Sequence, residues 1–263
     1  MTWHGQVSES HVHVARTKFP PVEVYISDMK TLGVKRAVLS QNIGNLDNEY
    51  LIETTQVNPD LFRAILMFDY DREETAAEIR RYSREPNVVG ARLFAETGAK
   101  SDQPLSIWRS IYENDWVASV RGPLSAIRAN HFKLILREFP DLRIRIEHLG
   151  SFLYDRDGEV EFQTLLELAD LPNVYLMWAG FFANSSGEYP YLDTQEYLRR
   201  LLSAFGSERI MWSGDWNAKV SEGDLEMCQN SMRLFTSRLL LPEITDLQLE
   251  NLMNSTLTRF LRW

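Results

Sequence analysis

Two histidines separated by a single valine stand near the start of the chain, His11 and His13. Because they fall in a β-rich segment, their side chains point to the same side, about 6 to 7 Å apart along the backbone. Two imidazole nitrogens in this arrangement can hold one divalent metal ion, zinc above all, or can donate hydrogen bonds to a substrate. Glu9 has the same parity and is expected to lie deeper on the same face.

A further histidine and an aspartate follow two other β-rich segments. His148 ends the run Ile-Arg-Ile-Glu-His, and Asp215 comes directly after Ser213 and Gly214. The carboxylate could be a metal ligand or a general base, and the imidazole could polarise a substrate or transfer a proton. The structural alternatives are a helix N-cap for Asp215 and a loop hydrogen bond for His148.

Five other side chains are candidates for substrate binding. Arg92 and Arg121 could pair with a substrate carboxylate, although a salt bridge within the fold is the commoner role of an arginine. Gln41 could donate a hydrogen bond to substrate, and Trp178 and Trp216 could form aromatic walls of a pocket.

The elements that must position these residues recur at an even interval. Eight β-rich runs are predicted, over residues 7–14, 36–40, 61–68, 87–95, 116–120, 142–148, 173–178 and 209–213. Helical periodicity lies between them, over 22–32, 73–83, 125–139, 159–168, 194–205 and 224–239, and a closing helix pair is expected over 245–263. This alternation predicts a single (β/α)8 TIM barrel that forms one domain over residues 1–263. A doubly wound open sheet is the alternative, but no Gly-rich fingerprint follows the first strand.

A barrel of this kind explains why the polar residues are so far apart in the sequence. Its active site lies at the carboxyl ends of the strands, where the first, sixth and eighth strands would bring His11, His13, His148 and Asp215 to one mouth.

Composition excludes several other classes of protein. The 263 residues carry 28 Lys and Arg against 37 Asp and Glu, a net charge of −9 spread along the chain, which argues against nucleic acid as a partner. The longest apolar run, 174–183, is too short to span a membrane, and residues 1–10 lack the features of a secretory signal. The single cysteine, Cys228, suits a reducing compartment, so a cytoplasmic location is expected.

The order of these motifs resembles the amidohydrolase superfamily. The resemblance rests on Glu9-Ser10-His11-Val12-His13, on Glu147-His148-Leu149-Gly150 and on Met211-Trp212-Ser213-Gly214-Asp215, with further similarity around Asp47, at Arg92 and over residues 254–260. It extends over nearly the whole chain. The group most similar to it includes 2-pyrone-4,6-dicarboxylate lactonase, sugar lactonases and aminocarboxymuconate semialdehyde decarboxylase.

The resemblance implies roles for four residues. His11 and His13 match a metal-binding pair, Asp215 matches the aspartate that activates water, and His148 matches a histidine that polarises the scissile group. Glu9 stands where the family usually has aspartate, and residues 116–121 lack the fifth-strand histidine of the fully metal-dependent members. A zinc ion held by His11, His13 and Asp215 and a metal-free site therefore both remain open.

Three functions are compatible with these residues. The first is hydrolysis of a lactone or ester of a small carboxylated acid or sugar acid, with Asp215 as the base. The second is metal-dependent decarboxylation or C–C hydrolysis of an aromatic-derived acid. The third is a non-catalytic barrel that binds a ligand. In each case the expected partner is a small molecule, and because related barrels often dimerise, a homodimer is a further expectation.

Overall fold

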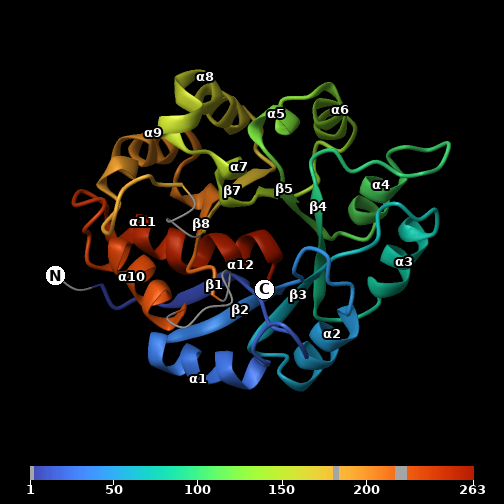
Figure 1. Ribbon diagram of the computed structural model, residues 1–263, viewed down its shortest axis with the longest axis horizontal. Helices are drawn as coiled ribbons and strands as arrows, with labels where there is room; N and C mark the ends of the chain where they lie inside the picture. Colours follow the sequence, from blue (N-terminus) through green and yellow to red (C-terminus); the bar gives the residue numbers. More distant parts are fainter. Residues whose placement is uncertain (1–2, 180–183, 217–223) are drawn as a thin grey trace.

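Eight parallel strands form one sheet in chain order, from β1 to β8. The computed structural model describes residues 3–179, 184–216 and 224–263. The last strand returns to the first, because Val12 bridges to Trp216 and the N–H of His13 donates to the Trp216 carbonyl at 3.3 Å. Helices surround the ring of strands (Figure 1). The predicted (β/α)8 barrel is confirmed.

The elements alternate along the chain. The strands are β1 (Val7–Val12), β2 (Val34–Ser40), β3 (Phe62–Leu66), β4 (Val88–Phe94), β5 (Val117–Arg121), β6 (Ile144–Ile146), β7 (Val174–Ala179) and β8 (Ile210–Ser213). The helices up to β6 are α1 (Val22–Leu32), α2 (Asn48–Val57), α3 (Thr75–Tyr82), α4 (Ser106–Glu113), α5 (Leu124–Ile127) and α6 (Asn130–Glu138). Those after β6 are α7 (His148–Ser151), α8 (Tyr154–Glu167), α9 (Gln195–Phe205), α10 (Asp224–Thr236), α11 (Asp246–Glu250) and α12 (Thr256–Leu261).

Two predicted elements differ from the structure. The helix expected over 125–139 is two helices, α5 and α6, because Ala129 between them has extended backbone angles, φ −65° and ψ 153°. The strand expected over 142–148 is only the three residues of β6, and His148 begins the turn that follows it. Helices α2 and α4 lie outside the predicted helical segments.

The amino end of the barrel is closed by the C-terminal helix. Buried side chains from alternate strand positions form one cluster inside it, namely Val38, Ile65, Val117, Met177 and Met211. Leu257, Phe260 and Leu261 of α12 join this cluster. Arg143, just before β6, donates to the Phe260 carbonyl at 2.5 Å, which fixes α12 at the end where the strands begin. The carboxyl end is thus the end left for a site.

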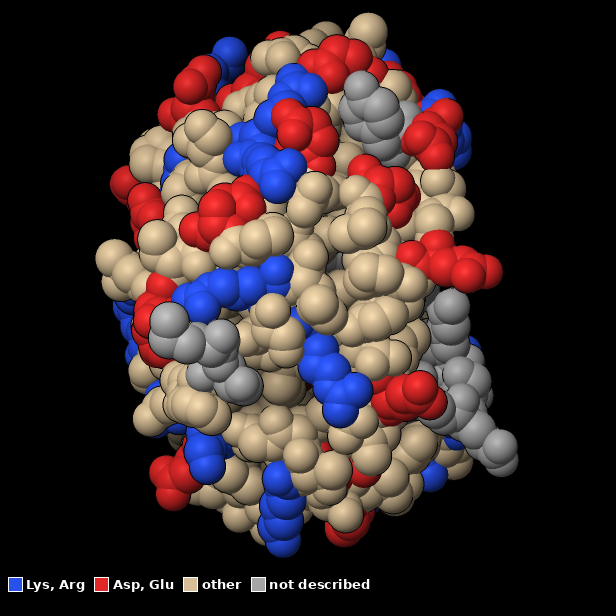
Figure 2. Space-filling model, turned by 90° about the vertical axis from the view of Figure 1, so that its left-hand side faces the viewer, with Lys and Arg blue, Asp and Glu red and all other residues tan. Residues whose placement is uncertain are grey.

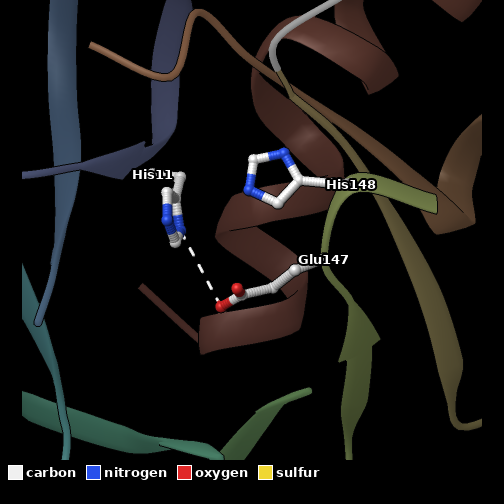
Figure 3. A group of neighbouring side chains, drawn as sticks. All are labelled: His11, Glu147 and His148. Carbon is white, nitrogen blue, oxygen red and sulfur yellow. Dashed lines mark ion pairs between the residues drawn. The ribbon is translucent and has the colours of Figure 1, made fainter. Parts of the chain in front are cut away.

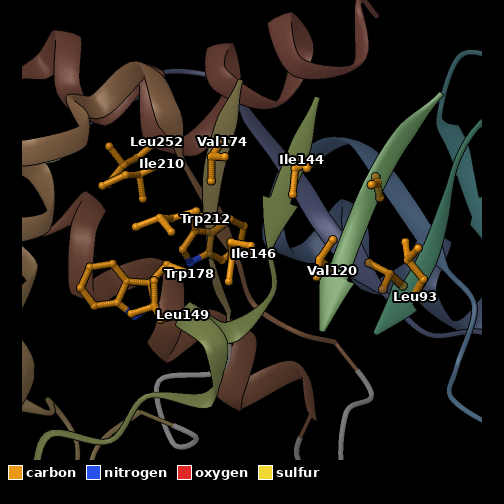
Figure 4. Close-up of a cluster of buried hydrophobic side chains, with 14 of the residues drawn as sticks. Leu93, Val120, Ile144, Ile146, Leu149, Val174, Trp178, Ile210, Trp212 and Leu252 are labelled. Atoms are coloured by element: carbon orange, nitrogen blue, oxygen red, sulfur yellow. The ribbon is translucent and has the colours of Figure 1, made fainter. Parts of the chain in front are cut away.

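The opposite parity of each strand packs outward against the helices. Leu93, Val120, Ile144, Ile146 and Val174 lie in this outer cluster (Figure 4). Trp212 belongs to it as well and donates from Nε1 to Ser231 Oγ of α10 at 3.0 Å. These contacts explain why the strands are short and strongly apolar, and they fix the register of the strands. The residues that point into the barrel can therefore be polar.

The described part of the chain contains no helix with the length and apolar character needed to cross a membrane. On the face seen in Figure 2, Lys and Arg side chains are interspersed with Asp and Glu side chains. This mixture matches the even spread of charge along the sequence.

Candidate functional site at the carboxyl end of the barrel

The structure brings His11, His13, His148 and Asp215 together at the carboxyl ends of β1, β6 and β8. The ring centres of His11 and His13 are 4.6 Å apart, and those of His11 and His148 are 5.7 Å apart. Nδ1 of His148 lies 4.0 Å from Oδ2 of Asp215. His11 and His148 point toward one another above Glu147 (Figure 3). Convergence at one mouth, predicted from strand order, is therefore observed.

The backbone is strained at two of these residues. His148 has φ 50° and Asp215 has φ 56°, in the left-handed region that residues other than glycine rarely occupy. Gly150 in the same turn as His148 has φ 65°, and a Cβ there would lie 2.5 Å from Leu124 Cδ2. Such strain persists only where surrounding contacts enforce it, and it concentrates at functional sites.

Glu9 enforces the turn that carries Asp215. Its carboxyl group accepts from the Ser213 hydroxyl and from the Gly214 N–H, the latter at 3.0 Å from each oxygen. Ser213 Oγ in turn accepts from the N–H of Asp215 at 2.9 Å. Burial raises the pKa of Glu9 to about 7, opposed by the hydrogen bonds from Ser213 and Gly214. The glutamate therefore lies beneath the turn, where it positions Asp215.

Asp215 is buried, with 3% of its surface exposed. Burial raises the pKa of its carboxyl group above the ordinary value of 3.8, and the nearby charges of His148, Arg92 and Arg121 oppose that rise. Oδ1 has no hydrogen-bond partner among the described residues. A buried acceptor without a partner is rare in native folds and points to a bound group.

Two of the histidines have a defined tautomer. Nδ1 of His13 lies 2.8 Å from the Ser40 carbonyl, and Nδ1 of His148 lies 3.1 Å from the Ala179 carbonyl. A carbonyl oxygen only accepts, so both rings carry a proton at Nδ1 and present Nε2 as an acceptor when neutral. Burial lowers the pKa of His13 to about 3, which keeps this ring neutral at physiological pH.

A buried ion pair lies below the histidines. Arg92 donates to Glu147 through Nε at 3.0 Å and through Nη2 at 2.8 Å, and its Nη1 donates to the Gln41 carbonyl at 2.9 Å. The side chains of Arg92 and Glu147 are 3% and 0% exposed. Burial alone would raise the pKa of Glu147, but the adjacent Arg92 and Arg145 lower it to about 2. Glu147 is therefore ionised at neutral pH.

The cluster has the donor set of a divalent metal site. His11, His13 and Asp215 each offer one ligand atom, and these atoms lie within 4.8 Å of one another. A second trio, His11, Glu147 and His148, meets the same criterion. Two imidazoles and a carboxylate are ligands that zinc commonly takes. Nε2 of His11 and Oδ1 of Asp215 are buried without a hydrogen-bond partner among the described residues, and both are atom types that bind zinc.

Among the predicted substrate-binding residues, Arg121 is the arginine whose guanidinium makes no hydrogen bond or ion pair within the described ranges. Its positive charge opposes the rise in the pKa of Asp215. Arg92 is engaged by Glu147, as above. Gln41 is 1% exposed, and its amide supports the following loop by donating to the Asp47 carbonyl at 2.9 Å.

The structure does not bring the two predicted tryptophans to the mouth. Trp178 is 1% exposed and packs outward between Tyr197 and Phe235 (Figure 4). Trp216 is 2% exposed, packs on Tyr25 and donates from Nε1 to Asp28 at 2.8 Å. Both rings serve the contact between barrel and helices.

Sequence reasoning missed Arg145 and Glu147 as site residues. They alternate with Ile144 and Ile146, so the two charged side chains share the inward parity of β6. Charged residues at alternate positions of a strand that is apolar at the others, in a barrel buried on both faces, are the signal that could have found them.

A cavity of about 790 Å³ opens at the same end of the barrel, and its lining includes none of His11, His13, His148 and Asp215. It is lined by the segments after β2, β3 and β4, among them Phe68, Asp69, Tyr70, Phe94 and Glu96. The hydroxyl of Tyr70 donates to the Arg92 carbonyl at 2.5 Å and so joins the cavity wall to the polar barrel interior. The volume is ample for a small-molecule ligand.

Two curated proteins have sequences similar to this chain. The chain is 24% identical over 192 residues to the L-fucono-1,5-lactonase of Burkholderia ambifaria, a match that covers 70% of this chain and 65% of that protein. It is 26% identical over 205 residues to the D-galactarolactone isomerase of Agrobacterium fabrum, covering 75% and 66% of the two chains. The matched part thus spans slightly less than two thirds of each of these relatives.

The same fold occurs in a solved amidohydrolase from Burkholderia multivorans with bound zinc, which is 16% identical. The TM-score is 0.78, with 98% of this chain and 99% of the other covered. The model of the Amidohydro_2 family, described as amidohydrolase, matches residues 10–263, which include every residue of the cluster. The chain therefore belongs to this amidohydrolase family.

Proposed function

We infer that the chain is a hydrolase that opens a lactone or ester of a small carboxylated acid or sugar acid, with Asp215 as the base that activates water. The observation that carries this proposal is the buried Oδ1 of Asp215, an acceptor without a partner in the described structure. Leaving such a group unpaired costs the fold about 1–3 kcal/mol, and a water molecule bound for reaction would meet the need. The two curated relatives, a lactonase and a lactone isomerase by name, support lactones as the substrate class.

In the proposed reaction the water oxygen attacks the lactone carbonyl carbon while Oδ1 of Asp215 takes the water proton. The ring C–O bond then breaks, and the proton passes from Asp215 to the departing oxygen. The base ends the cycle ionised. His148 lies beside Asp215, with Nδ1 4.0 Å from Oδ2, which supports a role for this ring in relaying that proton.

Substrate recognition is proposed to involve Arg121 and the adjacent cavity. Arg121 is the candidate partner for a substrate carboxylate, because Arg92 is already paired with Glu147. The faces of Phe68 and Tyr70 and the carboxylate of Asp69 in the cavity are of the type that bind a hydroxylated ring.

A divalent ion, zinc by choice of ligands, would be held by His11, His13 and Asp215. When bound it would polarise the carbonyl group and lower the pKa of water. The residues themselves supply the base and orient the substrate in either case. The lone buried Cys228 supports a cytoplasmic location for the protein.

The test is turnover of a panel of sugar lactones and carboxylated lactones in ¹⁸O-labelled water, followed by mass spectrometry. A hydrolase places one labelled oxygen in the carboxylate of the product. Products of unchanged mass would indicate an isomerase, release of CO2 from an aromatic acid would indicate a decarboxylase, and either result would overturn the proposal.

A further inference from the structure

Arg145 crosses the barrel interior beneath the histidines. It is fully buried on β6, yet its guanidinium contacts β1, β2 and β5. All four of its hydrogen-bond acceptors are neutral: Ser119 Oγ at 2.7 Å, the Ser10 carbonyl at 2.6 Å, Ser40 Oγ at 3.2 Å and His11 Nδ1 at 3.3 Å. A guanidinium keeps its proton in proteins, so the buried group is charged at neutral pH.

The contact with His11 determines where that imidazole holds its proton. A guanidinium has donors and no acceptor, so a neighbouring ring nitrogen must present its lone pair. A proton on Nδ1 of His11 would place two donors face to face at 3.3 Å and would leave a buried charge with one acceptor fewer. His11 is fully buried and lies 3.3 Å from the guanidinium of Arg145, a setting that disfavours a second positive charge, so the ring is neutral and has one proton.

Glu147 is the other candidate partner for Nδ1, and it would select the opposite tautomer. Its Oε1 lies 4.0 Å from Nδ1 of His11, beyond hydrogen-bond distance (Figure 3). Its two oxygens already accept from Arg92 and from the Ser119 hydroxyl. The carboxylate of Glu147 therefore has its donors without Nδ1 of His11, whereas the guanidinium of Arg145 uses this nitrogen as an acceptor.

We propose that Arg145 is a positioning residue that holds the proton of His11 on Nε2, so that His11 enters the site as a hydrogen-bond donor to the oxygen of the reacting carbonyl group. His11 is thereby opposite in tautomer to His13 and His148, which present acceptors. The buried Nε2 of His11, which has no partner among the described residues, is then a donor, and a donor at a carbonyl oxygen stabilises the charge which that oxygen gains during attack by water. A divalent ion could use this nitrogen only after the proton moved to Nδ1, against Arg145.

The role given to the carbonyl oxygen rests on the proposed function, but the tautomer does not. The chain has five histidines, so two-bond ¹H–¹⁵N correlation spectra of histidine-labelled protein are simple to interpret. The His11→Gln variant identifies the His11 signals. The expected result for the unmodified, metal-free protein is a proton on Nε2 of His11 and on Nδ1 of His13 and His148. A proton on Nδ1 of His11 would overturn the proposal, and this result requires no substitution at Arg145.

Substitution then tests the cause. Arg145→Met is expected to move the His11 proton wholly or partly to Nδ1 and to lower kcat for lactone opening at least about tenfold with KM within about twofold. Arg143→Met is the matched control, since it removes an arginine two residues earlier on the same segment that does not contact His11, and it should leave the tautomer unchanged. An unchanged His11 tautomer in folded Arg145→Met protein would refute the role of Arg145. Should that variant not fold, the tautomer of His11 in the unmodified protein still decides the proposal, because a proton on Nδ1 cannot coexist with acceptance from Arg145.

Discussion

The ion pair between Arg92 and Glu147 allows a quantitative test of the polar barrel interior. Both side chains are almost fully buried, and they share three N–O contacts of 2.8 to 3.0 Å. Removing one partner leaves the other charge in a site of low dielectric, which typically costs about 3–5 kcal/mol. We therefore expect Arg92→Met and Glu147→Gln each to lower the free energy of unfolding by about 3–5 kcal/mol, or the melting temperature by roughly 10 °C.

The double variant separates the pair from its surroundings. If the two charges stabilise one another, Arg92→Met combined with Glu147→Gln should cost at least about 2 kcal/mol less than the sum of the single substitutions. Urea denaturation of the four proteins, followed by circular dichroism, measures this difference. Arg128→Met is the control, because its pair with Glu161 is half-exposed and its loss should barely move the unfolding midpoint. Additive single effects of under about 1 kcal/mol each would refute the coupling.

Three further predictions concern catalysis, packing and metal binding. Because burial raises the pKa of Asp215 and the base must be ionised, kcat/KM should fall with falling pH along a limb whose midpoint lies above 3.8; a midpoint at or below that value would exclude the buried carboxylate as the base. Gly90→Ala would place a Cβ 2.4 Å from the Val117 carbonyl oxygen of β5 and should lower the free energy of unfolding, measured by thermal denaturation, by about 1–3 kcal/mol or more. Gly98→Ala is the control, because its Cβ would have no contact closer than 3.7 Å and should leave the free energy of unfolding unchanged. In calorimetric titration of chelator-treated protein with zinc, His13→Asn should weaken zinc binding at least about tenfold and His11→Asn should weaken it less. Of these two rings, only His13 presents its Nε2 lone pair without a change of tautomer, so the reverse order would contradict the assignment.

The sequence was sufficient to predict the barrel and the meeting of four residues at its mouth. The prediction rested on strand-end positions, because in a closed parallel sheet the last side chains of every strand lie at one end. It did not depend on the loop conformations, since the four residues are His11 and His13 at the end of β1, His148 after β6 and Asp215 after β8. The apolar residues near the C-terminus predicted a closing helix pair packed on the core, but not that this segment covers the amino end of the barrel.

What the sequence could not supply was the partner of each buried charge. Arg92 is 55 positions from Glu147, and a single sequence does not reveal that these two meet rather than Arg92 and a substrate. The helix is interrupted at Ala129 without a glycine or proline there, so the sequence did not predict that α5 and α6 are separate helices. The position of Trp178, in contrast, could have been predicted. It alternates with the strand in step with Val174 and Leu176, and that pattern alone places its side chain toward the helices.

The strained turns at His148 and Asp215 likewise could not be predicted from the sequence. Both residues depend on contacts from distant strands, as when Glu9 of β1 binds the N–H of Gly214 after β8. Glu9 therefore has a structural role at this position, since its side chain reaches the turn that carries the base.

The role of Asp215 is the central claim, and kcat for Asp215→Asn on the fastest lactone substrate tests it most directly. Asparagine keeps the size of the side chain but cannot take the water proton, so kcat should fall by about 10²–10⁴ while KM and the melting temperature stay close to those of the unmodified protein. A folded Asp215→Asn variant that retains more than about one tenth of the kcat would contradict the account.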